Sequence, residues 1–301
     1  MIFHYLKIAF RNLCKHKTQN IISIIGLAVG LLCFCVCIYC SRFVESTDHC
    51  FTNHDRIAEL NLYDGKADRY FSGSPVPLAE DLRTWSLGET EAISSVTYPR
   101  ERPYYVELSP EKMLPYELET IEIDTCYNKI FTPEMVAGHW KMASQSLNSV
   151  ILSQSMAIKI FGNAESAIGK HMTLMRRLNT SPESTPKTGG IVYTIQAVMK
   201  DIPLNNSLDF MQNIDMLTVN DSEGLLQSPK RHNMTGANTY VLLSPQTTCT
   251  DLEKQFSKRD YTYTLYDEAY TVTASNMGSR LKKQGASYLG LVTGTVGTLI
   301  L

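Results

Sequence analysis

Hydrophobic residues are most concentrated near the N-terminus, where residues 21–40 read IISIIGLAVGLLCFCVCIYC without a single charge. At 1.5 Å per residue, a helix of this length spans roughly 30 Å, the thickness of the hydrocarbon core of a bilayer. A cleaved signal peptide is the alternative, but its apolar run is shorter and ends at small residues. This run ends in YCSR, so the pattern predicts a transmembrane helix over residues 20–42.

The residues before this span carry an amphipathic pattern. Four apolar residues recur at helical spacing and three basic residues lie on other faces: Phe3, Leu6, Phe10 and Leu13, and Lys7, Arg11 and Lys15. This predicts a helix over residues 1–19 that contacts membrane lipid at the cytoplasmic surface. A simple extension of the spanning helix is the alternative.

After the span, residues 43–285 alternate between short β-rich runs and short helical patterns, which predicts one α+β domain. The expected strands are Arg56–Leu62, Tyr104–Leu108, Thr120–Tyr127, Ser149–Leu152, His171–Met175, Val192–Met199, Thr239–Leu243 and Tyr261–Thr273. The expected helices are Pro77–Trp85, Thr132–Gly138, Gln154–Phe161 and Thr250–Ser257. Ser153 and Thr248 are expected N-caps, and Gly162 is an expected helix stop. Residues 179–190, NTSPESTPKTGG, are expected to form an exposed hairpin tip between two strands.

Charge divides the chain in the same way as hydrophobicity. Residues 1–40 hold four Lys and Arg and no Asp or Glu, whereas the rest holds 24 Lys and Arg against 30 Asp and Glu. The positive-inside rule therefore predicts a cytoplasmic N-terminus and an extracytoplasmic domain. The net charge of −2 gives no case for nucleic-acid binding. Apolar residues make up 44% of the chain, which excludes a disordered protein.

A search for catalytic motifs finds none. The chain lacks G-x-x-x-x-G-K-[ST], H-E-x-x-H and G-x-S-x-G, and its one C-x-x-C, at Cys37 and Cys40, lies within the apolar span, so we expect no ATP hydrolysis, no catalytic residue, no metal and no cofactor. His49 and His54 flank Cys50 on an expected surface connection. Four carboxylates alternate along an expected strand and are interpreted as a solvated face: Glu117, Glu119, Glu122 and Asp124. Tyrosines at 104–105 and at 261, 263 and 266 are interpreted as strand packing.

Eight cysteines are present, and most of them lie in or beside the span. Cysteines on a lipid-embedded helix are interpreted as small apolar residues. Cys50, Cys126 and Cys249 lie outside the span, and a disulfide between Cys126 and Cys249 stays open.

Three linked segments resemble one family of membrane proteins. The segment LKIAFRNLCKHKTQNIISIIGLAVG at 6–30 is similar to the first helices of the MacB/FtsX-type ABC transporter permeases, especially large Bacteroidetes members. The stretch after the span matches the family at Glu45, Asp48, Asn53, Asp55, Arg56 and Ile57 and departs from it at Cys50 and at Ala58-Glu59.

The middle of the chain carries the most specific part of the likeness. Residues 121–140, 148–174 and 193–210 resemble the family's periplasmic core domain, with a Ser-initiated helix ending in Phe-Gly, an Ile-Gly-Lys turn and a strand ending in Lys-Asp-Ile-Pro. Gln196-Ala197 replaces the more usual small-residue pair. The likeness covers about residues 5–257, and the order of the motifs rather than any one of them is specific.

The resemblance implies a MacB-like periplasmic core on an N-terminal transmembrane helix, in the bacterial inner membrane. It implies a non-ATPase permease subunit that transmits ATP-driven motion across the membrane for export or efflux. The implied partners are an ABC ATPase, a second permease copy, membrane lipid, and periplasmic or outer-membrane components. Gly26 and Gly30 form a G-x-x-x-G pattern that is expected to pack on a partner helix.

The end of the chain departs from the family. Residues 286–301 are expected to be the start of a truncated second transmembrane helix, because the apolar run YLGLVTGTVGTLIL has only fourteen residues. A fragment or an inactive truncated gene product is therefore an open alternative. A single-span extracytoplasmic sensor or scaffold without transport activity is another.

Overall fold

The computed structural model describes residues 4–5, 15, 17–71, 73–85, 87–109, 112–174, 190–209, 212–222, 224–227, 235–265, 268–279 and 281–283. The chain divides into two compact units. One contains Met1–Ser46 and Arg280–Leu301, and the other is Thr47–Ser279, which we call the body. The predicted segment 286–301 and the basic residues Lys7 and Arg11 of the predicted surface helix lie outside the described residues.

Helix α2 (Lys17–Glu45) contains the predicted span. It has 29 residues, none of them buried, and its large apolar side chains are mostly half to two-thirds exposed. Of the residues that the structure describes, only this helix is long and apolar enough to cross a membrane, with a mean hydropathy of 2.9. The structure therefore has one N-terminal apolar helix as a candidate span.

The body is a mixed α+β unit, as the sequence predicts. Its strands are β1 (Ile57–Asp64), β2 (Arg69–Tyr70), β3 (Ser74–Pro75), β4 (Thr90–Thr97), β5 (Arg100–Ser109), β6 (Lys112–Ile123), β7 (Met135–Gly138), β8 (Ser149–Ser153), β9 (His171–Leu174), β10 (Ile191–Met199), β11 (Met216–Val219), β12 (Thr235–Leu243), β13 (Thr262–Leu265) and β14 (Glu268–Asn276). Its helices are α3 (Leu78–Arg83), α4 (Tyr127–Phe131), α5 (Trp140–Gln145), α6 (Gln154–Phe161) and α7 (Cys249–Lys258), with 3-10 turns at His54–Arg56 and Glu165–Ala167.

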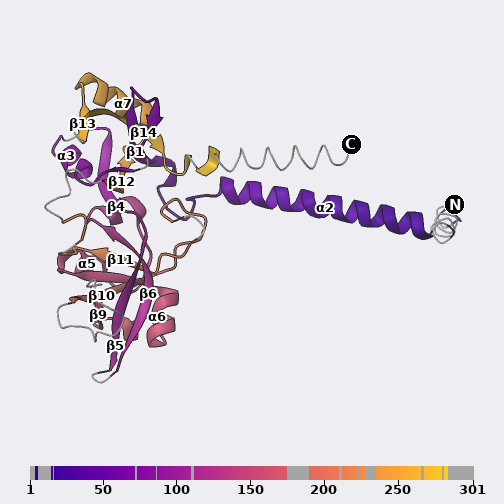
Figure 1. Cartoon of the computed structure of the whole chain (residues 1–301), viewed down its shortest axis with the longest axis horizontal. Coiled ribbons are helices and arrows are strands. Elements are labelled where there is room, and N and C mark those ends of the chain that lie inside the picture. Colours follow the sequence, from indigo (N-terminus) through magenta and orange to yellow (C-terminus); the bar gives the residue numbers. More distant parts are fainter. Residues whose placement is uncertain are drawn as a thin grey trace. The chain divides into compact units, whose positions relative to one another are not determined.

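Six strands close into a ring, which we call the closed group. Their order is β11-β8-β10-β9-β5-β6, and β6 pairs again with β11. The β8–β10 and β6–β11 pairs are parallel and the other pairs in the ring are antiparallel. This group occupies the lower half of the body in Figure 1, with the long β5–β6 hairpin at its end. Tyr104, Tyr193 and residues of α6 lie in its core.

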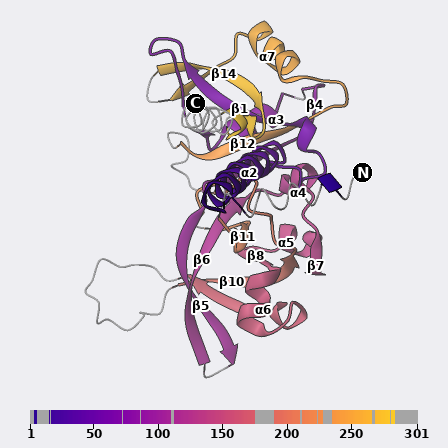
Figure 2. The same cartoon turned by 90° about the vertical axis from the view of Figure 1, so that its right-hand side faces the viewer.

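The remaining main strands form an open sheet in the order β4-β12-β1-β14-β13, which we call the open group. Its core includes residues of α3 and α7, among them Leu82 and Phe256. The two groups are stacked one above the other in Figures 1 and 2. They share β6, whose Ile123 pairs with Val96 of β4. A third apolar cluster joins them and includes Phe51, Tyr127 and Tyr240.

Several predicted elements are confirmed with shifted ends. Helix α6 begins after Ser153, whose side chain accepts a hydrogen bond from the Met156 backbone, and ends at Gly162 with φ +86°. Helix α7 begins at a capping box between Thr248 and Asp251. Strands β9 and β10 pair antiparallel, as expected of a hairpin, although its predicted tip lies mostly outside the described residues.

Three predictions are wrong in local detail. The helix expected at Thr132–Gly138 lies earlier, as α4, because Thr132 adopts φ +43° and stops it, and Met135–Gly138 is strand β7. The strand expected at Thr120–Tyr127 begins at Lys112 and ends at Ile123. It ends there because the Asp124 carboxylate accepts the Cys126 backbone N–H and starts a turn. The strand expected over Tyr261–Thr273 is two strands, β13 and β14, which pair with each other.

Candidate functional site

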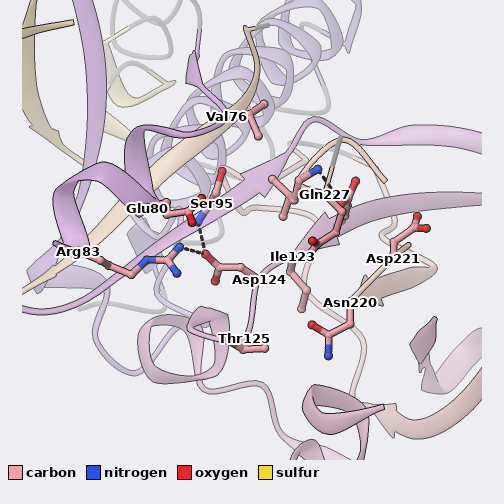
Figure 3. A pocket seen from close by; sticks show the side chains of 12 residues that line it. Val76, Glu80, Arg83, Ser95, Ile123, Asp124, Thr125, Asn220, Asp221 and Gln227 are labelled. Carbon is pink, nitrogen blue, oxygen red and sulfur yellow. Dashed lines mark hydrogen bonds and ion pairs between the residues drawn. The ribbon is translucent and has the colours of Figure 1, made fainter. Parts of the chain in front are cut away.

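A cavity of about 240 Å³ lies where β6 ends beside β4 and the chain after β11. Its lining is Val76, Glu80, Arg83, Ser95, Glu122, Ile123, Asp124, Thr125, Asn220, Asp221, Leu226 and Gln227. Figure 3 shows these side chains around the hollow. The lining draws on both the closed and the open group, so the cavity lies at their junction.

Glu122 is a buried carboxylate of the cavity and is only 4% exposed. Its two oxygens accept backbone hydrogen bonds from Leu225, at 2.6 Å, and Leu226, at 2.8 Å. Gly224 lies so close that a Cβ there would be 2.2 Å from the carboxylate. Burial raises the pKa of Glu122 to about 7, and the charge of Asp221 acts in the same direction.

Asp124 lies across the cavity and is also held on both oxygens. One accepts from the Ser94 hydroxyl at 2.7 Å and from the Cys126 backbone, and the other accepts from the Ser95 backbone at 2.9 Å. Arg83 of α3 completes the set with an ion pair of 2.5 Å. In Figure 3, Arg83 and Ser95 converge on this carboxylate.

Asp221 is the third interior carboxylate and is 1% exposed. The Tyr193 hydroxyl donates to it at 2.9 Å, and Arg102 lies 3.9 Å from its other oxygen. Burial and this carboxylate together raise the pKa of Tyr193 above its usual range. Both oxygens of Glu122 and of Asp124 accept hydrogen bonds from the protein itself, and Asp221 is held by the Tyr193 hydroxyl, which suits a structural role better than a catalytic pair.

The sequence interpretation of the β6 carboxylates as a solvated face is wrong for two of them. Glu117 and Glu119 lie on the more open face of the strand, whereas Glu122 and Asp124 bond inside the body. Because side chains alternate along a strand, Glu122 lies on the face of the buried Leu118 and Thr120, opposite to Glu117 and Glu119. The odd spacing between Glu119 and Glu122 in the sequence indicates two faces, and the parallel pairing of β11 with β6 contributes to the burial of the end of β6.

Among the residues that the structure describes, no three His, Cys, Asp or Glu side chains converge as metal ligands would. The rings of His49 and His54 are 4.4 Å apart, and His54 also contacts Asp55 at 3.3 Å. The thiol of Cys50 beside them has its pKa raised to about 11, chiefly by burial and then by the charge of Asp48.

A second cluster ties the two ends of the body together. Asp48 is 1% exposed and accepts two hydrogen bonds from Ser207, from the backbone N–H at 2.6 Å and from the hydroxyl at 2.5 Å. Its own N–H donates to the carbonyl of Asn205 at 3.0 Å. Gly278 packs directly on the Asp48 carboxylate, where a Cβ would be 2.2 Å from one oxygen.

The remaining candidates from the sequence stand apart from these clusters. Cys126 and Cys249 are free thiols, and Cys249 donates to Asn276. Tyr104 and Tyr263 are buried in strand packing, and the Tyr261 ring lies 4.1 Å from that of Trp85. The Tyr266 position lies outside the described residues.

Of the predicted helix-packing and interfacial residues, the structure describes Gly26, Gly30 and Lys15. Beyond the neighbouring residues and the backbone of its own helix, a Cβ on Gly26 or Gly30 would meet nothing within 4 Å. Lys15 is exposed. Their assignments to a partner helix and to the membrane surface stay predictions.

Neither the comparison with protein-family models nor the comparison with curated proteins finds a match. The comparison with solved structures does. A domain of a protein described as a permease, from Porphyromonas gingivalis, is 21% identical, with a TM-score of 0.55 over 75% of this chain and 93% of that one. The body has the fold of this permease domain.

Two further structures are matched at lower similarity. The periplasmic region of MacB from Actinobacillus actinomycetemcomitans is 13% identical, with a TM-score of 0.48 over 78% of this chain and 94% of that one. The extracellular domain of the noncanonic ABC-type transporter YknZ, from Gram-positive bacteria, is 12% identical, with a TM-score of 0.40 over 73% of this chain and all of that one.

Proposed function

We propose that this chain is the non-ATPase permease subunit, or the N-terminal part of one, of a MacB/FtsX-type ABC transporter in a bacterial inner membrane. The N-terminus would lie in the cytoplasm and the body in the periplasm. One observation carries the proposal. The fold that the body shares with a permease domain directly follows an apolar helix of 29 residues.

In this proposal the chain does mechanical work and is not itself an enzyme. ATP would bind and be hydrolysed on a partner ATPase subunit, and a second permease copy would complete the membrane part. Motion of α2 would be passed to the body, which acts on cargo or on periplasmic or outer-membrane components for export or efflux. The Asp124 carboxylate supports this role, because it follows β6 and accepts hydrogen bonds from Ser94 and Ser95 of β4, and so holds the two strand groups together.

The test is copurification of the tagged full-length chain from membranes of its native host in a mild detergent. We expect an ABC ATPase and a second permease copy to appear in comparable amounts, and to be absent from a matched purification of an unrelated single-span protein. Recovery of the chain without either subunit would favour the single-span sensor or scaffold instead.

A further inference from the structure

The chain between α2 and the body passes through one heavily bonded residue. Asp48 follows the last residue of α2, Glu45, by three positions, and it adopts φ +70°, a conformation that non-glycine residues rarely keep. Such a backbone persists where the surroundings determine it fully. Here the surroundings are the three hydrogen bonds to Asn205 and Ser207.

The C-terminal end of the body meets the same point. Gly278 adopts φ +71° and leaves no room for a side chain beside Asp48 and Ser207. The neighbouring Met277 N–H donates to the carbonyl of Ile57 at the start of β1. Asp48, Ser207 and Gly278 thus form a three-segment contact, which we call the clasp.

The segment that carries Ser207 is held by hydrogen bonds within its own turn. It leaves β10 through the sequence KDIP at 200–203. The Asn206 side chain is fully buried and bridges the turn, donating to the Pro203 carbonyl and accepting from the backbone of Leu208 and Asp209. Proline fixes the backbone at one side of this turn. A displacement applied at Ser207 is therefore not absorbed within it.

The same segment is anchored in the closed group at its other end. The Lys200 backbone donates to Glu134, and the Asp201 carboxylate accepts the Ser155 backbone of α6. Further on, the Asp215 side chain accepts from the Glu119 backbone of β6. The segment therefore connects the clasp to β6, α6 and β10.

We propose that Asp48 is a coupling residue, which passes displacement of the end of α2 through Ser207 to the closed group. The proposal deepens the proposed function, in which α2 is the moving part. The coupling can also be tested without that function, because any force that tilts or shifts α2 would be passed on through Asp48 and Ser207. The route through β1 alone would move the open group first, because β1 pairs with β12 and β14.

The test displaces α2 without any ATPase. The full chain is placed in nanodiscs of phosphatidylcholine with short or long acyl chains, because a change in bilayer thickness makes a spanning helix tilt or shift. Hydrogen exchange is then measured by mass spectrometry. We expect exchange in residues 200–209 and in β6 to differ at least threefold between thin and thick bilayers in the wild type.

Two substitutions separate coupling from plain stability. Asp48→Asn keeps the shape but loses charge-assisted acceptors, so exchange at 205–209 should rise about tenfold or more while its dependence on thickness disappears. Ser207→Thr keeps the hydroxyl and should keep the dependence, and Asp55→Asn, on the exposed turn nearby, should leave it unchanged. Protected β12 peptides show whether each variant is folded.

Three outcomes would overturn the proposal. They are no thickness dependence in the wild type, the same dependence in a folded Asp48→Asn chain, or a dependence confined to β1 and β14. None of them bears on whether an ATPase copurifies with the chain, so the failure of this proposal and the failure of the proposed function can be distinguished.

Discussion

The carboxylate of Glu122 on β6 accepts the backbone N–H of Leu226, 104 residues later in the chain, at 2.8 Å. This bond and its neighbour from Leu225 fasten the segment after β11 onto the strand that both groups share. Burial nevertheless raises the pKa of Glu122 to about 7. The contribution of Glu122 to the stability of the body therefore depends on pH.

The first prediction concerns this pH dependence. The unfolded carboxyl has a pKa of 4.5 and the folded one about 7, so the folded body binds the proton more tightly within this window. The free energy of unfolding should then fall by about 1–3 kcal/mol as pH rises from 4.5 to 7. The Glu122→Gln variant should lack this fall in the free energy of unfolding. The measurement is chemical denaturation of the full chain in detergent at several pH values, followed by tryptophan fluorescence.

Glu117→Gln provides the matched control, because Glu117 is exposed on the same strand. The free energy of unfolding of Glu117→Gln should change with pH as much as that of the wild type. The raised pKa would be contradicted if the free energy of unfolding of Glu122→Gln changed with pH as much as that of the wild type. Glu122 would then be an ordinary hydrogen-bond acceptor.

The second prediction concerns the glycine of the clasp. Gly278→Ala forces a side chain into a left-handed backbone and against the Asp48 carboxylate, so the free energy of unfolding should fall by about 3 kcal/mol or more. Gly88→Ala is the control, because a Cβ there meets nothing within 4 Å and should change stability by less than about 0.5 kcal/mol. Equal stabilities of the two variants would mean that Asp48 and Ser207 can move aside for a side chain at position 278 at little cost in free energy.

Local signals in the sequence predict the parts of the fold that depend on neighbouring residues. Ser153 and Gly162 delimit α6 because a cap and a left-handed stop act within one turn of the helix. The apolar run predicts α2 for a similar reason, since length and composition alone decide it. The same holds for the hairpin of β9 and β10.

Longer-range features could not be predicted in this way. The sequence places Asp48 and Ser207 in two segments of the family resemblance, but nothing local indicates that they meet. Strand β11 is similar, because its four residues gain their strand identity from β6 and β8 on either side. The odd spacing of Glu117 and Glu122 places them on opposite faces of β6, but which of the two faces is interior depends on the strands that pair with β6.

The third prediction tests the predicted cap of α6. Ser153→Ala removes the acceptor for the Met156 backbone, in a residue that is 2% exposed, and should lower the free energy of unfolding by about 1 kcal/mol. Ser155→Ala, on the exposed side of the same turn, should stay within about 0.5 kcal/mol of the wild type. Equal losses in the two variants would mean that the hydroxyl of Ser153 contributes nothing as a cap.

The fourth prediction concerns α2 and the assembly of the proposed transporter. Small residues four apart allow two membrane helices to approach closely, and replacing both Gly26 and Gly30 with Leu places bulk on that face. Both glycines belong to the compact unit that contains α2 and not to the body, so the double variant should leave the body's stability unchanged. It should instead reduce recovery of the second permease copy and the ATPase in the copurification. Replacement of Leu27 and Leu31 by Ile, which keeps apolar bulk on the same helix, is the control. Normal recovery of both subunits with the glycine variant would show that this face of α2 does not pack on a partner helix.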